Sequence, residues 1–130
     1  MKGIYALIIK LDKNKQIRIG RLGPIDFKKG QYVYIGSALN SLPGRINRHL
    51  RHDKKIHWHI DYLLSEAKIS EVLFLETGEK LECHYSKKLQ ENLDVIKNFG
   101  ASDCSCGGHL FFSPENPACL LEDFSRFPAP

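Results

Sequence analysis

The chain has 130 residues, the size of a single domain. A domain of this length buries somewhat under ~70% of its unfolded surface, which is enough for an ordinary hydrophobic core. No apolar run approaches the roughly 18 residues of a membrane-spanning helix, and the N-terminus has no signal-peptide pattern. We therefore expect a soluble cytoplasmic protein whose four cysteines are reduced.

The net charge of +4 is concentrated in residues 45–55. This stretch has one acid, Asp53, and its five basic residues are Arg45, Arg48, Arg51, Lys54 and Lys55. The other 119 residues carry 14 basic and 14 acidic side chains and sum to zero. A solvated helix face could have this composition, but a basic patch on an otherwise neutral chain favours a surface that binds a polyanion.

The first third of the chain predicts β-strands. Residues 4–11 are rich in Ile and Leu, and residues 16–22 show apolar alternation. A polar turn separates the two segments, so they are predicted to form a hairpin. Residues 31–35 predict a further strand.

A helix is predicted to begin after Ser41, which can cap it, with Pro43 in the first turn, where proline costs little. The apolar side chains at helical spacing, which we expect to face the core, are Leu42, Ile46 and Leu50. Arg45 and His49 lie four residues apart and therefore on one face. We expect both on the polar side of this helix.

The remaining segments alternate between helix and strand. Residues 56–65 predict a helix, 71–76 a short buried strand and 79–92 another helix. This order predicts an α+β fold with a small antiparallel or mixed β-sheet flanked by helices. We expect one domain over residues 1–113, followed by a C-terminal tail over 114–130 whose last dozen residues are loosely docked.

Two tripeptides lie at the edges of predicted strands: Gly3-Ile4-Tyr5 and Tyr34-Ile35-Gly36. Together with Arg45, His49 and a later carboxylate in this order, they resemble the catalytic signature of the GIY-YIG nuclease superfamily. That superfamily includes some homing endonucleases and the nuclease module of bacterial nucleotide excision repair. The resemblance is closest to the small stand-alone Uri-type members, known mainly as DUF123 proteins.

The resemblance implies metal-dependent endonuclease hydrolysis of phosphodiester bonds. Tyr5 and Tyr34 would be the motif tyrosines, one of which assists deprotonation of water. A phenol pKa near ~10 would have to be lowered, or the proton relayed, for this to work near neutrality. Arg45 would clamp the phosphate, and His49 stands where family members place a His or Tyr.

The resemblance also implies a metal-binding glutamate on a later helix. The candidates are Glu71, Glu76, Glu79 and Glu82. Glu82 is the choice, because it begins the stretch that resembles the family's glutamate helix. Its hard oxygen ligands suit one Mg²⁺ or Mn²⁺ ion.

The expected partner is nucleic acid, DNA rather than RNA, and its phosphates are expected to contact Arg48, Arg51, Lys54 and Lys55. A protein partner or a homo-oligomer could supply specificity. Two alternatives stay open: a non-catalytic nucleic-acid-binding module and a zinc-bearing interaction domain.

One feature departs from the family pattern. Tyr5 and Tyr34 are 29 positions apart, whereas the two tripeptides of the family usually stand closer together. Either the sheet has gained an inserted strand, or Tyr5 is not the geometric equivalent of the family's first tyrosine.

Two further segments resemble the Uri-type relatives, residues 57–62 and 99–106. In the first, His57 and Asp61 lie at i, i+4 if helical, and could either support the site or form a structural network. The second belongs to the Cys-containing segment 99–109, where Cys104, Cys106 and His109 form Cys-x-Cys-x-x-His. Zinc sites favour wider Cys spacing, so metal-free reduced cysteines are expected. The zinc alternative would need a fourth ligand from Cys83, His84 or Cys119.

Overall fold

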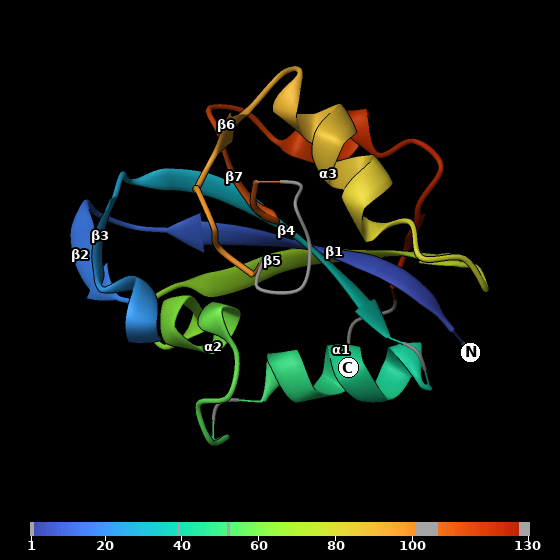
Figure 1. Ribbon diagram of the computed structural model, residues 1–130, viewed down its shortest axis with the longest axis horizontal. Coiled ribbons are helices and arrows are strands. Elements are labelled where there is room, and N and C mark those ends of the chain that lie inside the picture. Colours follow the sequence, from blue (N-terminus) through green and yellow to red (C-terminus); the bar gives the residue numbers. More distant parts are fainter. Residues whose placement is uncertain (1, 39, 52, 101–106, 128–130) are drawn as a thin grey trace.

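The computed structural model describes residues 2–38, 40–51, 53–100 and 107–127. In this part of the chain, an antiparallel six-stranded sheet has the order β6-β7-β4-β1-β5-β8, and β2 and β3 form a separate two-stranded sheet (Figure 1). The strands are β1 (Gly3–Leu11), β2 (Lys15–Arg18), β3 (Pro24–Phe27), β4 (Gly30–Ala38), β5 (Lys68–Glu76), β6 (Asp94–Val95), β7 (Leu110–Ser113) and β8 (Ser125–Arg126). The helices are α1 (Leu42–Leu50), α2 (His59–Leu64) and α3 (Glu82–Gln90), with 3₁₀ turns η1 (Gly20–Leu22) and η2 (Pro117–Leu120). The predicted α+β class is confirmed.

The central strand of the large sheet is β1. Of its nine residues only Lys10 is exposed. It pairs with β4 on one edge and with β5 on the other. Both edges are therefore occupied, and the predicted hairpin between residues 4–11 and 16–22 is wrong. Instead β2 folds back onto β3 in a sheet of its own.

Helices cover both faces of the large sheet (Figure 1). Because side chains alternate along a strand, β1 contributes to two cores. Tyr5, Leu7 and Ile9 pack with apolar side chains of α1 and α2. Ile4, Ala6 and Ile8 pack with α3 and β7 on the opposite face. The elements that carry the predicted site residues are thus fixed by one sheet.

The predicted start of α1 is confirmed. The Ser41 side chain accepts a hydrogen bond from the Gly44 amide at 3.0 Å, and Pro43 lies in the first turn. The placement of His49 on the polar side is wrong, since only 2% of this residue is exposed. Position 49 follows Leu42 by seven residues, and this spacing returns it to the buried stripe of the helix.

The segment after β7 packs more closely than the loose tail that we expected. Leu121 is buried, β8 pairs with β5, and the ring of Phe127 lies against Phe74 with centroids 6.1 Å apart. None of the helices in the described residues is long and apolar enough to cross a membrane.

Candidate active site

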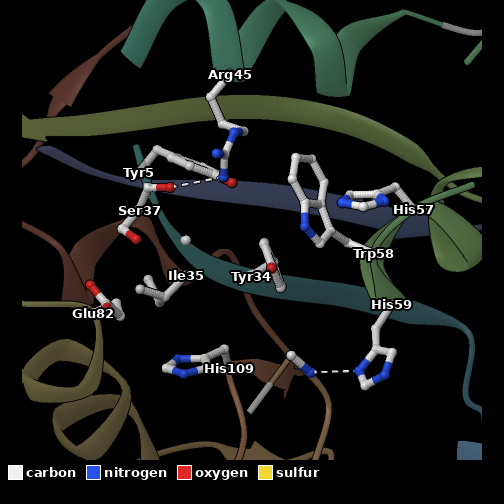
Figure 2. Close-up of a pocket in the computed structure, with 12 residues that line it drawn as sticks. Tyr5, Tyr34, Ile35, Ser37, Arg45, His57, Trp58, His59, Glu82 and His109 are labelled. Carbon is white, nitrogen blue, oxygen red and sulfur yellow. Dashed lines mark hydrogen bonds between the residues drawn. The ribbon is translucent and has the colours of Figure 1, made fainter. Parts of the chain in front are cut away.

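A polar cavity of about 290 Å³ opens beside β4 (Figure 2). β7 pairs with β4 only as far as Tyr34, so the next residues of β4 border the cavity instead of another strand. The cavity is lined by Tyr5, Tyr34, Ile35, Gly36, Ser37, Arg45, His57, Trp58, His59, Glu82, Gly100 and His109. The structure therefore brings Tyr5, Tyr34, Arg45 and Glu82 together from four elements.

The two motif tyrosines are neighbours because the inserted segment folds away as β2 and β3. Tyr5 is paired with Gly36, two positions beyond Tyr34, and the two tyrosine rings are 6.4 Å apart between centroids. Gly36 has to be glycine, because a Cβ there would lie 2.4 Å from Cζ of Tyr5. The last residue of the second tripeptide thus makes room for the ring of the first.

Both tyrosines are neutral phenols near neutral pH. Burial raises the pKa of Tyr5 far above its usual value; the neighbouring Tyr34 adds to this, and Arg45 opposes it. Burial also raises the pKa of Tyr34 to about 12. The Tyr5 hydroxyl lies 2.7 Å from Nε2 of the buried His49. His49 itself does not line the cavity and reaches it through Tyr5.

Arg45 reaches the cavity from α1. Its Nη1 donates to the carbonyl of Ser37 at 3.0 Å, and its guanidinium lies 4.5 Å from the centroid of the Trp58 ring (Figure 2). Arg48 also lies over that ring, at 4.3 Å. Trp58 therefore holds two arginines of α1 through cation–π contacts.

Asp61 is a structural partner of this stack. Its buried carboxylate accepts hydrogen bonds from both terminal nitrogens of Arg48, each at 3.1 Å. It also accepts hydrogen bonds from the backbone amides of His57 and Trp58, at 2.9 and 3.0 Å. Burial pushes the pKa of Asp61 upward, but these bonds, that of Arg48 above all, bring it below its usual value. His57, the other predicted supporting residue, lines the cavity, and its ring lies against that of Trp58.

The four predicted nucleic-acid contacts fall into two groups. Arg48 is committed to Asp61, and Lys54 donates to the carbonyls of His49 and Arg51 near the end of α1. Arg51 and Lys55 are exposed, and the described residues provide no partner for their side chains. The second pair is available to a ligand without rearrangement.

Glu82, at the start of α3, is the one carboxylate that the described residues contribute to the cavity lining. Its Oε2 is buried and has no hydrogen-bond partner among the described residues. Glu71 also has one such oxygen, but it pairs with Arg126 through the other and does not line the cavity. Glu76 and Glu79 are exposed and lie outside the lining.

Several residues of the lining were not assigned to the site from the sequence, among them Trp58, His59 and Gly100. Nδ1 of His59 accepts a hydrogen bond from the Gly100 amide at 2.9 Å (Figure 2). His109, which the sequence grouped with Cys104 and Cys106, also lines this cavity, with Nδ1 2.6 Å from the hydroxyl of Ser86. The resemblance at residues 57–62 and 99–106 was the available signal, because Trp58 and His59 belong to the first segment and Gly100 to the second.

The Cys-x-Cys-x-x-His prediction cannot be followed further in the structure, since Cys104 and Cys106 lie outside the described residues. Within the described ranges, no group of three or more His, Cys, Asp or Glu side chains is arranged to hold a metal ion. Of the described residues, Glu82 alone would offer a carboxylate to a cation there, with water or substrate oxygens as further ligands.

The fold and the cavity define an α+β protein with a site to which the described residues contribute two tyrosines, an arginine and one carboxylate. The chain belongs to the DUF123 family, a domain of unknown function, whose model matches residues 4–127. No curated protein and no solved structure matches the chain.

Proposed function

We propose that this protein is an endonuclease that hydrolyses phosphodiester bonds in DNA with the help of one divalent metal ion, as in the GIY-YIG nucleases that its sequence resembles. One observation carries the proposal: Glu82, which has a buried carboxylate oxygen without a partner among the described residues, lines the same cavity as Tyr5, Tyr34 and Arg45. An unpaired buried carboxylate oxygen is costly, and a bound cation would remove that cost.

The residues present fit Mg²⁺ or Mn²⁺. Glu82 offers a hard oxygen ligand, and such ions commonly bind through one or two carboxylates plus substrate phosphates and water. When bound, the ion would polarise a phosphoryl oxygen and make a bound water more acidic. The protein's own part is to hold Glu82, Arg45 and the tyrosines around one phosphate.

Arg45 supports the proposal as a phosphate clamp. Its planar guanidinium has five N–H donors, of which the Ser37 carbonyl takes one. The Trp58 face restrains the plane of the group, so less side-chain freedom is lost when a phosphate binds. The remaining donors can pair with two phosphate oxygens.

Tyr5 and His49 supply a route for the proton of the attacking water. Burial raises the pKa of both tyrosines, which favours a proton relay through the phenol over a preformed phenolate base. Burial lowers the pKa of His49 to about 4, so the imidazole is neutral, and with its hydrogen on Nδ1 it accepts a hydrogen bond from the Tyr5 hydroxyl at Nε2. As the water oxygen bonds to phosphorus, the bond to the leaving oxygen breaks and that oxygen takes a proton from solvent, while the water proton passes to Tyr5. The Tyr5 proton moves to Nε2 of His49.

The test is a cleavage assay on branched, duplex and single-stranded DNA, and on RNA, with Mg²⁺ or Mn²⁺. We expect cleavage of DNA by the wild type and a loss of several orders of magnitude in Glu82→Gln, since metal stabilisation of phosphoryl charge is worth several kcal/mol. Glu79→Gln, a neighbouring exposed residue outside the cavity, is the matched control and should cleave normally.

The stability of Glu82→Gln in metal-free buffer separates catalytic from structural effects. Removing a charge that has an unpaired buried oxygen should leave the free energy of unfolding unchanged or higher. If no substrate is cut while DNA still binds, the protein is a binding module. If stoichiometric zinc is found and is lost in Cys106→Ser, the interaction-domain alternative takes its place.

A further inference from the structure

His59 lines a side of the cavity that contains none of the proposed catalytic groups. In Figure 2, His59 and Arg45 are on opposite sides of Tyr34. His59 is the first residue of α2, its ring packs against Phe99 with centroids 5.6 Å apart, and it is partly exposed to the cavity.

The Gly100 amide determines where His59 carries its proton. The N–H of Gly100 donates to Nδ1 of His59 at 2.9 Å, so Nδ1 has to be the unprotonated nitrogen. This contact excludes both the imidazolium and the Nδ1–H tautomer. The remaining form carries its hydrogen on Nε2, and burial lowers the pKa of His59, which keeps the ring neutral.

The backbone around Gly100 is built to make this contact. Gly100 has φ +68°, a conformation that other residues rarely adopt, and a Cβ there would lie 3.2 Å from Cε1 of Tyr34. The same glycine thus packs against one motif tyrosine and orients His59. Among the described residues Nε2 of His59 has no protein partner, and it is not one of the buried unpaired atoms.

We propose that His59 is a substrate-binding residue whose Nε2–H donates a hydrogen bond to a phosphate oxygen held in the cavity, on the side away from Arg45. This inference rests on the proposed function for the class of ligand, a phosphodiester. A neutral donor there would add a directional contact without a second positive charge, so Arg45 and the cation at Glu82 remain the main electrostatic partners of the phosphate.

The first experiment uses the wild-type protein. Long-range ¹H–¹⁵N correlation spectra at neutral pH should show His59 as the Nε2–H tautomer, and titration with inorganic phosphate in metal-free buffer should shift its Nε2 resonance. The exposed His84, on α3 outside the cavity, is the internal control and should not follow the same titration. An Nδ1–H tautomer, or no response at His59, would overturn the inference.

Two variants then separate binding from structure. His59→Asn keeps an acceptor near the Nδ1 position for Gly100 but loses the distal donor, whereas His59→Gln can place an amide donor near the Nε2 position. We expect the dissociation constant for inorganic phosphate to rise about ten-fold in His59→Asn, because a hydrogen bond to a charged group is lost. In His59→Gln, which keeps a donor, it should rise only about two-fold. Equal binding by Asn and wild type would show that His59 only holds Gly100.

These measurements need neither metal nor turnover. Phosphate binding that depends on the His59 donor, in a protein that cuts no DNA, would retain the inference and reject the nuclease. Cleavage that persists in His59→Asn at wild-type kcat/KM, with unchanged phosphate affinity, would reject the inference alone.

Discussion

His49 lies on the buried face of α1 and contacts the cavity residue Tyr5. Its Nε2 meets the Tyr5 hydroxyl, and its ring lies near those of Tyr34 and Trp58, with centroids 6.3 and 5.8 Å apart. Its Nδ1 is buried without a partner among the described residues. Such a histidine is retained at a cost in stability, and that cost should depend on pH.

We predict that His49 makes folding acid-sensitive. Burial lowers its pKa from 6.5 to about 4, with Asp61 opposing this shift and Arg48, Arg45 and Lys54 adding to it. Between these two values the unfolded chain binds more protons, so stability falls as pH drops from 6.5 to 4. The contribution is on the order of 3 kcal/mol.

Urea unfolding at pH 7, 5.5 and 4 measures this effect. The comparison is His49→Phe, which keeps a ring but cannot titrate, and the quantity of interest is the change with pH rather than the absolute stability. His59 and His109, whose pKa values are also lowered by burial, are present in both proteins. An identical pH dependence in the two proteins would mean that His49 is not held neutral by the fold.

At the scale of elements, the connection from α1 to α2 depends on one carboxylate. Asp61 lies in the first turn of α2, where acidic groups favour the helix dipole, and it binds the two amides that precede the helix. It also binds Arg48 of α1. One buried side chain thereby fixes the position of Trp58, against which Arg45 stacks.

We predict that Arg48 contributes to stability rather than directly to DNA affinity. Arg48→Met leaves a fully buried carboxylate without its cation and should cost about 3 kcal/mol, near the low end for breaking a buried pair because Arg48 is itself 21% exposed. Asp61→Asn should cost less, since the partly exposed guanidinium can be hydrated. Chemical denaturation measures both.

Arg51→Ala is the matched control, because this exposed arginine from the same stretch should change stability by no more than about 0.5 kcal/mol. If Arg48→Met behaves like Arg51→Ala, the ion pair contributes nothing, and Arg48 returns to the set of nucleic-acid contacts.

Local signals predicted the elements better than their pairing. The cap at Ser41, the helix of residues 42–50 and the strand of residues 4–11 follow from spacing and capping chemistry. Strand pairing does not, because β1 pairs with segments far along the chain, and nothing local distinguishes these from the adjacent residues 16–22. His49 was placed on the polar side of its helix because histidine is a polar residue type, although position 49 belongs to the buried face of that helix.

The site was predictable only in part for a similar reason. Tyr5, Tyr34, Arg45 and Glu82 were chosen through a family resemblance, and the structure places them around one cavity. The contact between His59 and Gly100 spans 41 positions and depends on a backbone conformation, so residue types alone could not reveal it.

For the whole molecule, the basic stretch at residues 45–55 is a mixed surface rather than a uniform one. Arg48 and Lys54 are bound internally, which leaves Arg45 in the cavity and the exposed Arg51 and Lys55 as the cations best placed for phosphate. Three phosphate contacts for duplex DNA predict a slope of log affinity against log salt of about −2.7.

We predict that Arg51→Ala combined with Lys55→Ala reduces this slope to about −0.9, since about 0.9 is lost for each phosphate contact removed. Fluorescence anisotropy on a duplex between low and moderate salt, with Ca²⁺ or no metal to prevent cleavage, gives the slope directly. Binding should weaken similarly for all sequences, because phosphate contacts carry no sequence information.

The control is a second double variant, Lys13→Ala with Lys97→Ala, which removes the same charge from exposed positions outside residues 45–55. General attraction between a basic protein and DNA would lower affinity equally in both double variants. Specific phosphate contacts at Arg51 and Lys55 require the slope to change only in the first. Equal slopes in all three proteins would mean that DNA binds on another face. Arg51 and Lys55 would then not contact the phosphates of the DNA.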